Sequence, residues 1–165
     1  MHKPEIVDIE FIQRLYDEAT AYANTVGFID WPTPFPLETL EAIIANDELY
    51  VWGDKVPIAA AKISLNAPEM IWGEVKENDA FLYLGKLVGS QAIRNTGYIE
   101  DIVMNDAKQF AALQDKSGIR LDCLADNKKL CTLYSRLGYE SQGFATFWST
   151  FQAKQLVVNK FQIEL

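Results

Sequence analysis

Apolar residues recur with helical spacing in four stretches of the chain, so the pattern predicts four amphipathic helices. The first is expected to end near Gly27 and the last near Gly138, since glycine commonly closes a helix. In the second, Glu38 and Glu41 lie in the early turns, where negative charge suits the helix dipole. The predicted helices cover residues 11–23, 37–45, 97–117 and 128–137.

Runs of β-branched and aromatic residues between turn signals predict seven strands. Gly53-Asp54-Lys55 separates two of them and has the composition of a tight hairpin connection. The segment Ile29–Pro36 combines three prolines with aromatic residues, which predicts an ordered loop. An aromatic-rich connection is expected between the last two strands. The strands are expected at Ile6–Asp8, Leu49–Trp52, Val56–Leu65, Phe81–Val88, Ile119–Leu124, Tyr139–Phe144 and Gln155–Glu164.

The order of these elements predicts an α+β fold, with one mixed sheet and helices on its faces, rather than a doubly wound sheet. The chain has 165 residues, 49% of them hydrophobic, and no internal repeat or linker. A single domain over residues 1–165 with a substantial core is therefore expected. The formal net charge of −8 makes the chain a poor partner for a nucleic-acid backbone, so nucleic acid is not expected as a ligand.

The histidine and cysteine content argues against several kinds of site. The single histidine is His2, in a segment expected to fray, which excludes histidine-dependent triads and most catalytic zinc sites. Cys123 and Cys131 are the only cysteines, and reduced thiols in the cytoplasm are expected for both. The chain shows no signal-peptide core and no apolar run of about 20 residues, so a soluble, cytoplasmic protein is expected.

A strand, a loop and a helix N-terminus follow one another at Phe81–Val88, Gly89–Thr96 and Gly97. This arrangement presents unpaired backbone N–H groups at the positive end of a helix dipole, a combination that binds phosphate. Arg94 adds a positive charge at the same place. The alternative is an ordinary connection between a strand and a helix, because every such unit needs a turn of this kind.

A second unit of strand, turn and helix carries polar side chains. Asn127 follows the strand Ile119–Leu124, and Tyr134 comes seven residues later, two turns along the same helix face. The two side chains could therefore reach one crevice. Each also has a structural alternative, Asn127 as the cap of the following helix and Tyr134 as a packed aromatic residue of the core.

Both units resemble the signature motifs of the GCN5-related N-acetyltransferase (GNAT) family, and the resemblance extends over nearly the whole chain. The second motif is the more specific, because several residue types agree at fixed spacing. The segment Gly27–Phe35 also resembles the opening of a bacterial subgroup of this family. The matching segments are Leu82–Val88 with Arg94–Ile99, and Leu121–Cys123 with Asn127, Leu133-Tyr134 and Leu137–Tyr139.

The resemblance implies a GNAT-like, mostly antiparallel mixed sheet of about seven strands with four helices on its faces. Two neighbouring parallel strands at its centre, one leading into each motif, splay apart and hold acetyl-CoA. The family pattern places the pantetheine arm on the backbone of Leu87 and Val88, lets Asn127 contact the same arm, and brings Tyr134 close to the sulfur. It places the pyrophosphate on the N–H groups of Arg94, Asn95, Thr96, Gly97, Tyr98 and Ile99.

The resemblance also implies an N-acetyltransferase that works without histidine or a metal. The amine of a small molecule or peptide attacks the thioester carbonyl, a backbone N–H near Val88 stabilises the oxyanion, and Tyr134 protonates the departing thiolate. Tyrosine suits the acid role because its ordinary pKa of about 10 keeps it protonated at neutral pH. No general base is assigned, because Phe81–Val88 lacks the usual glutamate of the family; Glu74 and Asp101 are weak candidates.

Departures from the family pattern favour an alternative function. Ile99 stands where the family has glycine or alanine, Asn95 replaces a common glycine, and one extra residue follows Val88. The isoleucine is expected to crowd the pyrophosphate. The alternative is therefore a catalytically impaired GNAT-fold module for ligand sensing or protein interaction.

The acceptor pocket and the oligomeric state stay open at the level of the sequence. Trp31, Phe35 and Trp72 are candidates to line a pocket for the amine acceptor, and packing beneath the proline-rich loop explains them equally well. The strand Gln155–Glu164 either pairs across a homodimer or lies inside the sheet.

Overall fold

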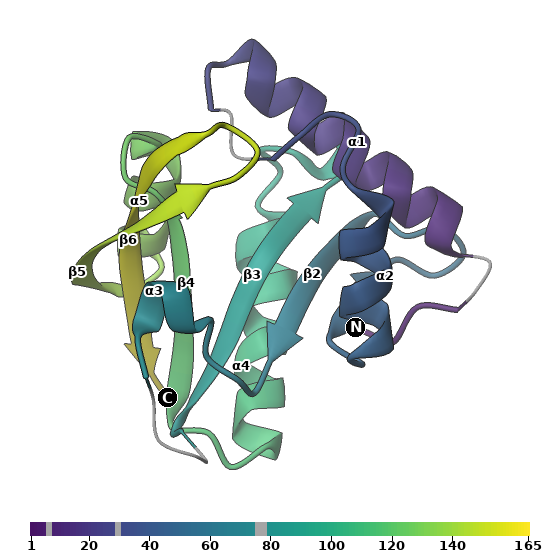
Figure 1. Cartoon of the computed structure of the whole chain (residues 1–165). Coiled ribbons are helices and arrows are strands. Elements are labelled where there is room, and N and C mark those ends of the chain that lie inside the picture. Colours follow the sequence, from purple (N-terminus) through teal and green to yellow (C-terminus); the bar gives the residue numbers. More distant parts are fainter. Residues whose placement is uncertain (6–7, 29–30, 75–78) are drawn as a thin grey trace. The chain divides into compact units, whose positions relative to one another are not determined.

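The computed structural model describes residues 1–5, 8–28, 31–74 and 79–165. The strands within these residues are β1 Leu49–Trp52, β2 Ala59–Ser64, β3 Phe81–Gly89, β4 Gly118–Leu124, β5 Glu140–Ser149 and β6 Lys154–Glu164. They form one six-stranded sheet in the order β1-β2-β3-β4-β6-β5 (Figure 1). β3 and β4 run parallel, whereas β1 is antiparallel to β2, and β6 is antiparallel to both β4 and β5. The α+β class and the mixed sheet are confirmed.

Five α-helices lie in the same described ranges: α1 Ile9–Thr25, α2 Leu37–Ala45, α3 Glu69–Trp72, α4 Met104–Leu113 and α5 Lys128–Arg136. A π-helical turn over Ile99–Val103 leads directly into α4. The four predicted helices are confirmed, and α3 is an addition. Its four residues make about one turn, too short for a helical period to show in the sequence. None of these helices has the length and apolar character needed to cross a membrane.

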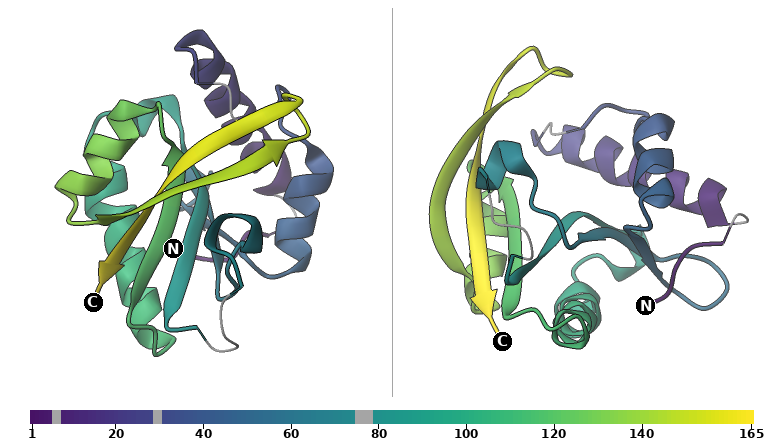
Figure 2. Two further views of the ribbon diagram at one scale, coloured as in Figure 1. Left: turned by 60° about the vertical axis from the view of Figure 1, so that its left-hand side comes forward. Right: turned by 60° about the horizontal axis from the view of Figure 1, so that its bottom comes forward.

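Six of the seven predicted strands are confirmed. The first, expected at residues 6–8, falls mainly on residues 6 and 7, which lie outside the described residues. β6 lies between β4 and β5, so of the two alternatives for this strand the internal position is confirmed. Both views of Figure 2 show β5 and β6 as one long, twisted hairpin.

β5 continues to Ser149, so the prediction of an aromatic-rich connection after Phe144 is wrong. The aromatic residues of this segment belong to the strand, where successive side chains point to opposite faces. Phe147 packs on one face with Leu156 and Val158 of β6, whereas Trp148 is 59% exposed. The alternation is that of a strand, although the clustered aromatic residues hide it in the sequence.

The chain forms two compact units. The first contains residues 1–63 and 85–106, and the second contains residues 64–84 and 107–165. The core of the first unit includes one face of α1, the inner residues of α2 and β1, and the end of β3. Its buried members are Ile12, Leu15, Tyr16, Phe35, Leu40, Ile43, Leu49, Val51, Ala60 and Val88.

The proline-rich loop of the first unit is ordered by α1. The Phe35 N–H donates to Asp17 Oδ1 at 2.8 Å, and Gln13 Nε2 donates to the Phe35 carbonyl at 2.7 Å. The Phe35 ring is 2% exposed and stacks on Tyr16 with centroids 4.5 Å apart. The prediction of an ordered loop is confirmed for residues 31–36, and residues 29–30 lie outside the described residues.

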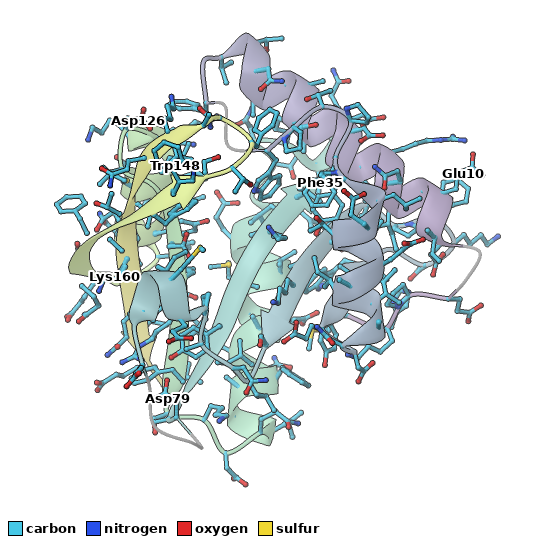
Figure 3. All side chains as sticks on the ribbon, in the orientation of Figure 1. Glu10, Phe35, Asp79, Asp126, Trp148 and Lys160 are labelled. Carbon is cyan, nitrogen blue, oxygen red and sulfur yellow. The ribbon has the colours of Figure 1, made fainter. Side chains whose placement is uncertain are left out.

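In the second unit a polar network joins the starts of β3 and β4. The Tyr83 hydroxyl donates to the Asp79 carboxylate, and Arg120 Nη1 donates to Asp79 Oδ2 at 3.1 Å and to the Tyr83 oxygen at 3.0 Å. Asp79 lies beside the beginning of β3 in Figure 3. Burial, assisted by the hydrogen bond to Asp79, raises the pKa of Tyr83 to about 12. The network fixes the start of the parallel strand pair.

Candidate functional site

The parallel pairing of β3 with β4 lies at the starts of the two strands. Its register places Phe81, Leu82 and Tyr83 opposite Gly118, Ile119 and Arg120. Both strands continue beyond these pairs, β3 to Gly89 and β4 to Leu124. The continuation of β3 leads into the first candidate motif, and that of β4 leads into the second.

β3 is distorted three residues before its end. Lys86 has a positive φ of 49°, which is unusual for a residue other than glycine. Its carbonyl oxygen accepts a hydrogen bond of 2.8 Å from the Tyr16 hydroxyl of α1. The next two residues are the predicted contacts of the pantetheine arm: Leu87 is half-buried, and Val88 is 4% exposed within the core. Tyr16 therefore positions the backbone that leads into these two residues.

The loop after β3 is shaped by its own backbone and by Thr96. The N–H groups of Arg94 and Thr96 donate to the carbonyls of Gln91 and Ile93, each at 3.3 Å. The Thr96 hydroxyl donates to the Ile93 carbonyl at 2.8 Å and accepts from the Tyr98 N–H at 3.3 Å. Three of the N–H groups predicted to bind pyrophosphate are thus engaged inside the loop.

Two residues of this loop adopt left-handed backbone conformations, Asn95 at φ 63° and Gly97 at φ 85°. Asparagine tolerates this region better than most residues, so Asn95 can replace the glycine of the family pattern. At Gly97 a Cβ would also lie 3.2 Å from Asp101 Oδ2. In the first helical turn, which starts at Ile99, the Asp101 N–H donates to the Gly97 carbonyl at 2.8 Å.

The Ile99 side chain turns toward the end of β3. A Cβ on Gly89 would lie 3.4 Å from Ile99 Cδ1 and 3.0 Å from Ile93 Cδ1. The glycine at position 89 therefore leaves room for Ile93, whereas a Cβ there would make only an ordinary van der Waals contact with Ile99. The approach of Ile99 to Gly89 was missed in the sequence, because the two positions are ten residues apart.

Arg94 rests on an aromatic ring of α1. Its guanidinium carbon lies 4.1 Å from the centroid of the Tyr22 ring, a cation–π contact. The arginine is half-buried, and the ring is on the last turns of α1. The contact ties the loop to α1, and Tyr22 is a second residue that sequence analysis did not single out.

In the second unit, Asn127 caps α5. Its Oδ1 accepts a hydrogen bond of 3.1 Å from the Leu130 N–H, and its carbonyl accepts one of 3.0 Å from the Cys131 N–H. The capping alternative is therefore confirmed. The cap uses the oxygen of the amide group, whereas the NH₂ group of the same side chain is a donor with a separate direction.

Tyr134 lies two turns into α5 and is 7% exposed. Its ring packs edge-on against Phe161 of β6 at 5.5 Å and lies 6.1 Å from the Tyr139 ring. Burial is the main cause that raises the pKa of Tyr134 above its ordinary value, so the phenol is protonated. No side chain or carbonyl in the described part of the chain hydrogen-bonds to its hydroxyl.

The chain is similar to acetyltransferases in sequence and in structure. No family model matches it. It is 30% identical over 104 residues to the uncharacterised N-acetyltransferase YesJ of Bacillus subtilis, and this match covers 61% of the chain and 57% of YesJ. The match thus spans a little over half the length of that relative.

Two solved structures share the fold over almost the entire chain. A GNAT-family acetyltransferase from Listeria monocytogenes has a TM-score of 0.77 at 19% identity, over 99% of this chain and 93% of that chain. The NatC complex bound to Gag peptide and CoA has a TM-score of 0.68 at 14% identity, over 100% of this chain and 95% of that chain. This chain has the GNAT fold.

The shared GNAT fold agrees with the resemblance seen in the two motifs. The central parallel pair, β3 with β4, and the antiparallel strands around it are those of the GNAT fold. Of the aromatic candidates for an acceptor pocket, Phe35 is buried in the core of the first unit. Trp31 meets Phe35 edge-on at 5.5 Å, and in the second unit the Trp72 ring lies 4.7 Å from the Arg120 guanidinium. The packing alternative is confirmed for Phe35.

Proposed function

We propose that this protein is a GNAT-family N-acetyltransferase that transfers the acetyl group of acetyl-CoA to the amine of a small molecule or a peptide. The observation that carries the proposal is the state of Tyr134. Its phenol is buried, protonated and not hydrogen-bonded to any described residue. A phenol held in this way is available to give a proton to a ligand, which is the step that thioester aminolysis requires.

Acetyl-CoA is proposed to bind along the end of β3 and the loop after it. Its pantetheine arm would pair with the backbone of Leu87 and Val88. This assignment is supported by the extended conformation of both residues in β3 and by the contact of Tyr16 with the preceding carbonyl. The NatC complex, which has the same fold, is bound to CoA, and this supports binding of the same class of ligand here.

The pyrophosphate is proposed to bind the loop and the first helical turn. Arg94, Asn95, Thr96, Gly97, Tyr98 and Ile99 supply the candidate N–H groups. Because Arg94, Thr96 and Tyr98 already donate within the loop, Gly97 and Ile99 are the stronger candidates. Negative charge at this position would also be favoured by the dipole of the helix that begins at Ile99.

Tyr134 is proposed as the general acid. When the amine nitrogen bonds to the carbonyl carbon and the carbon–sulfur bond breaks, the phenol gives its proton to the leaving thiolate. The attacking nitrogen loses one proton, and that proton restores the phenol through water, so the protons balance. The raised pKa favours this return, since a buried phenolate is disfavoured. The N–H of Val88 is proposed to stabilise the oxyanion.

Asn127 is proposed to hold the cofactor arm through its NH₂ group. The Oδ1 of the same side chain caps α5 and is not available for this contact. The cap fixes the orientation of the amide, so a single residue would start the helix that carries Tyr134 and also contact the ligand. Asn127 can therefore both cap α5 and contact the cofactor arm, the two roles proposed from the sequence.

The activity test compares Tyr134→Phe with Tyr139→Phe, since both lose one hydroxyl from neighbouring buried rings. Products of acetyl-CoA with a panel of small amines and short peptides are measured by mass spectrometry. Tyr134→Phe is expected to lower kcat by roughly 100- to 10,000-fold, the usual contribution of a general acid. Its Kd for acetyl-CoA should be unchanged, and Tyr139→Phe should keep both values. Equal turnover in Tyr134→Phe and wild type would refute the acid role.

The second candidate function is a non-catalytic GNAT-fold module, favoured by the size of Ile99. The orientation of this side chain counts against the module, because the Cδ1 end of the isoleucine lies toward Gly89 at the end of β3. A thermal-shift titration with acetyl-CoA up to about 1 mM separates the two functions. A rise in Tm together with acetylated product supports the enzyme. A flat titration and no product across the amine panel would support the module.

A further inference from the structure

The two cysteines of the chain face each other in the second unit. Cys123 is on β4 and Cys131 is in the first turns of α5, and their Sγ atoms are 3.6 Å apart. Both are thiols, and they differ in access, since Cys123 is 7% exposed whereas Cys131 is half-buried. The bond length of a disulfide is about 2.05 Å, so the sulfurs need to approach by roughly 1.5 Å.

The backbone between the two thiols is well anchored. The Ala125 N–H donates to the Val157 carbonyl of β6 at 2.9 Å, and the Asn127 N–H donates to the Leu124 carbonyl at 3.0 Å. Asn127 then caps α5 through the Leu130 N–H. These bonds fix the end of β4 and the start of α5, so the fold itself brings the thiols together. The short distance between the two sulfurs is thus set by the anchored backbone and not by mobile surface side chains.

We propose that Cys123 and Cys131 are a modification site that forms a reversible intramolecular disulfide when the protein meets hydrogen peroxide. The thiolate of Cys131, the more accessible of the two, attacks one peroxide oxygen and becomes a sulfenic acid with release of water. The Cys123 sulfur then attacks the sulfenic sulfur and displaces a second water. In total, two thiols and one peroxide give one disulfide and two waters, so the sulfurs are oxidised and the peroxide is reduced.

The location of the pair points to a consequence for the proposed activity, and this part rests on the proposed function. Cys131 is three residues before Tyr134, and the connection between the two thiols contains Asn127. Closing the disulfide pulls the first turn of α5 toward β4, which shifts both proposed site residues. Because a misplacement of about 1 Å can cost up to about 100-fold in rate, we expect oxidation to lower kcat by roughly tenfold.

The chemical test needs no activity. The full chain is treated with hydrogen peroxide, and the remaining thiols are labelled with a maleimide after denaturation. The wild type is expected to lose both labelling sites, to become lighter by about 2 Da through loss of two hydrogens, and to regain both thiols with dithiothreitol. Monomeric protein that keeps two thiols, or that gains oxygen mass instead, would overturn the proposal.

Cys131→Ser and Cys123→Ser are the matched variants, each with one thiol. Neither can form a disulfide within one chain, so neither should become lighter by about 2 Da as a monomer. Circular dichroism checks that each is folded, and Cys131→Ala replaces Cys131→Ser if the hydroxyl is not tolerated. Disulfide formation in wild type with unchanged kcat would overturn the regulatory consequence alone. Absence of acetyl transfer in reduced protein would refute the proposed function and leave the disulfide result standing.

Discussion

The loop after β3 and the first turns of α5 hold their candidate residues in different ways. The loop is shaped by main-chain conformation, with Asn95 and Gly97 at positive φ and three N–H groups bonded internally. The start of α5 is shaped by side chains, with the Asn127 cap and the buried Tyr134 ring. We therefore expect changes in the loop to alter affinity for acetyl-CoA, and changes in α5 to alter turnover.

The largest expected effect on the loop comes from Gly97→Ala. Gly27 has the same φ of 85° with nothing near its Cβ position, so Gly27→Ala is a matched control for backbone strain. Each variant should lose about 1 kcal/mol of unfolding free energy. Only Gly97→Ala should also weaken acetyl-CoA binding, by roughly tenfold in calorimetry, since about 1.4 kcal/mol of strain at the bound backbone corresponds to that factor. Equal affinities in the two variants would contradict a binding role for this loop.

The next effect separates the two roles of Asn127. Asn127→Ala loses the cap and should lower the free energy of unfolding by about 1 kcal/mol. Asn127→Asp keeps an oxygen for the Leu130 N–H and should preserve stability, while it removes the proposed NH₂ contact with the cofactor arm. Urea unfolding measures the first effect and the KM for acetyl-CoA the second. If Asn127→Asp binds acetyl-CoA as the wild type does, Asn127 is a cap and nothing more.

A smaller effect is expected at Tyr22, whose ring supports Arg94. Tyr22→Ala removes a cation–π contact of about 0.5–1 kcal/mol and should raise the KM for acetyl-CoA by roughly threefold, with kcat retained. Tyr22→Phe keeps an aromatic face and should restore the wild-type KM. A loss of kcat in Tyr22→Ala would mean that the ring does more than position the arginine.

Of these changes, replacement of Tyr83 is expected to have the smallest effect at neutral pH. Its pKa in the folded protein is about 12, above the value of about 10 in an unfolded chain. The folded protein therefore keeps a proton that the unfolded chain releases, and the resulting stabilisation is complete below pH 10 and is lost as the pH rises toward 12. Chemical unfolding at pH 8 to 10.5 should show the stability difference between wild type and Tyr83→Phe shrinking as the pH rises. A constant difference would show that Tyr83 ionises normally.

Much of the fold could be predicted from the sequence because local signals mark its elements. α2 begins at Leu37 and ends at Ala45, as the helical period predicts. The end of β5 could not be predicted in this way, because its aromatic residues are placed by packing with β6, a long-range contact. α3 is too short to have a period of its own. The parts of the fold that the local sequence pattern does not predict are therefore set mostly by long-range packing.

For the candidate site, the sequence predicted residue types better than their surroundings. Asn127 and Tyr134 could be singled out from spacing, whereas the burial of Tyr134 against Phe161 of β6 depends on residues far away in the chain. The same holds for Arg94, whose support by Tyr22 joins segments 72 residues apart. The sequence indicated that Ile99 would crowd the pyrophosphate, but not that its side chain lies toward Gly89. The roles of the loop residues in ligand binding stay predictions.

The position of β6 between β4 and β5 has a consequence for biosynthesis. A ribosome makes both neighbours of β6 before β6 itself, so a nascent chain that has just completed β5 carries β4 and β5 with unsatisfied hydrogen-bonding edges. Such edges invite pairing with other chains. A chain truncated before Lys154 is therefore expected to be less soluble than the full chain.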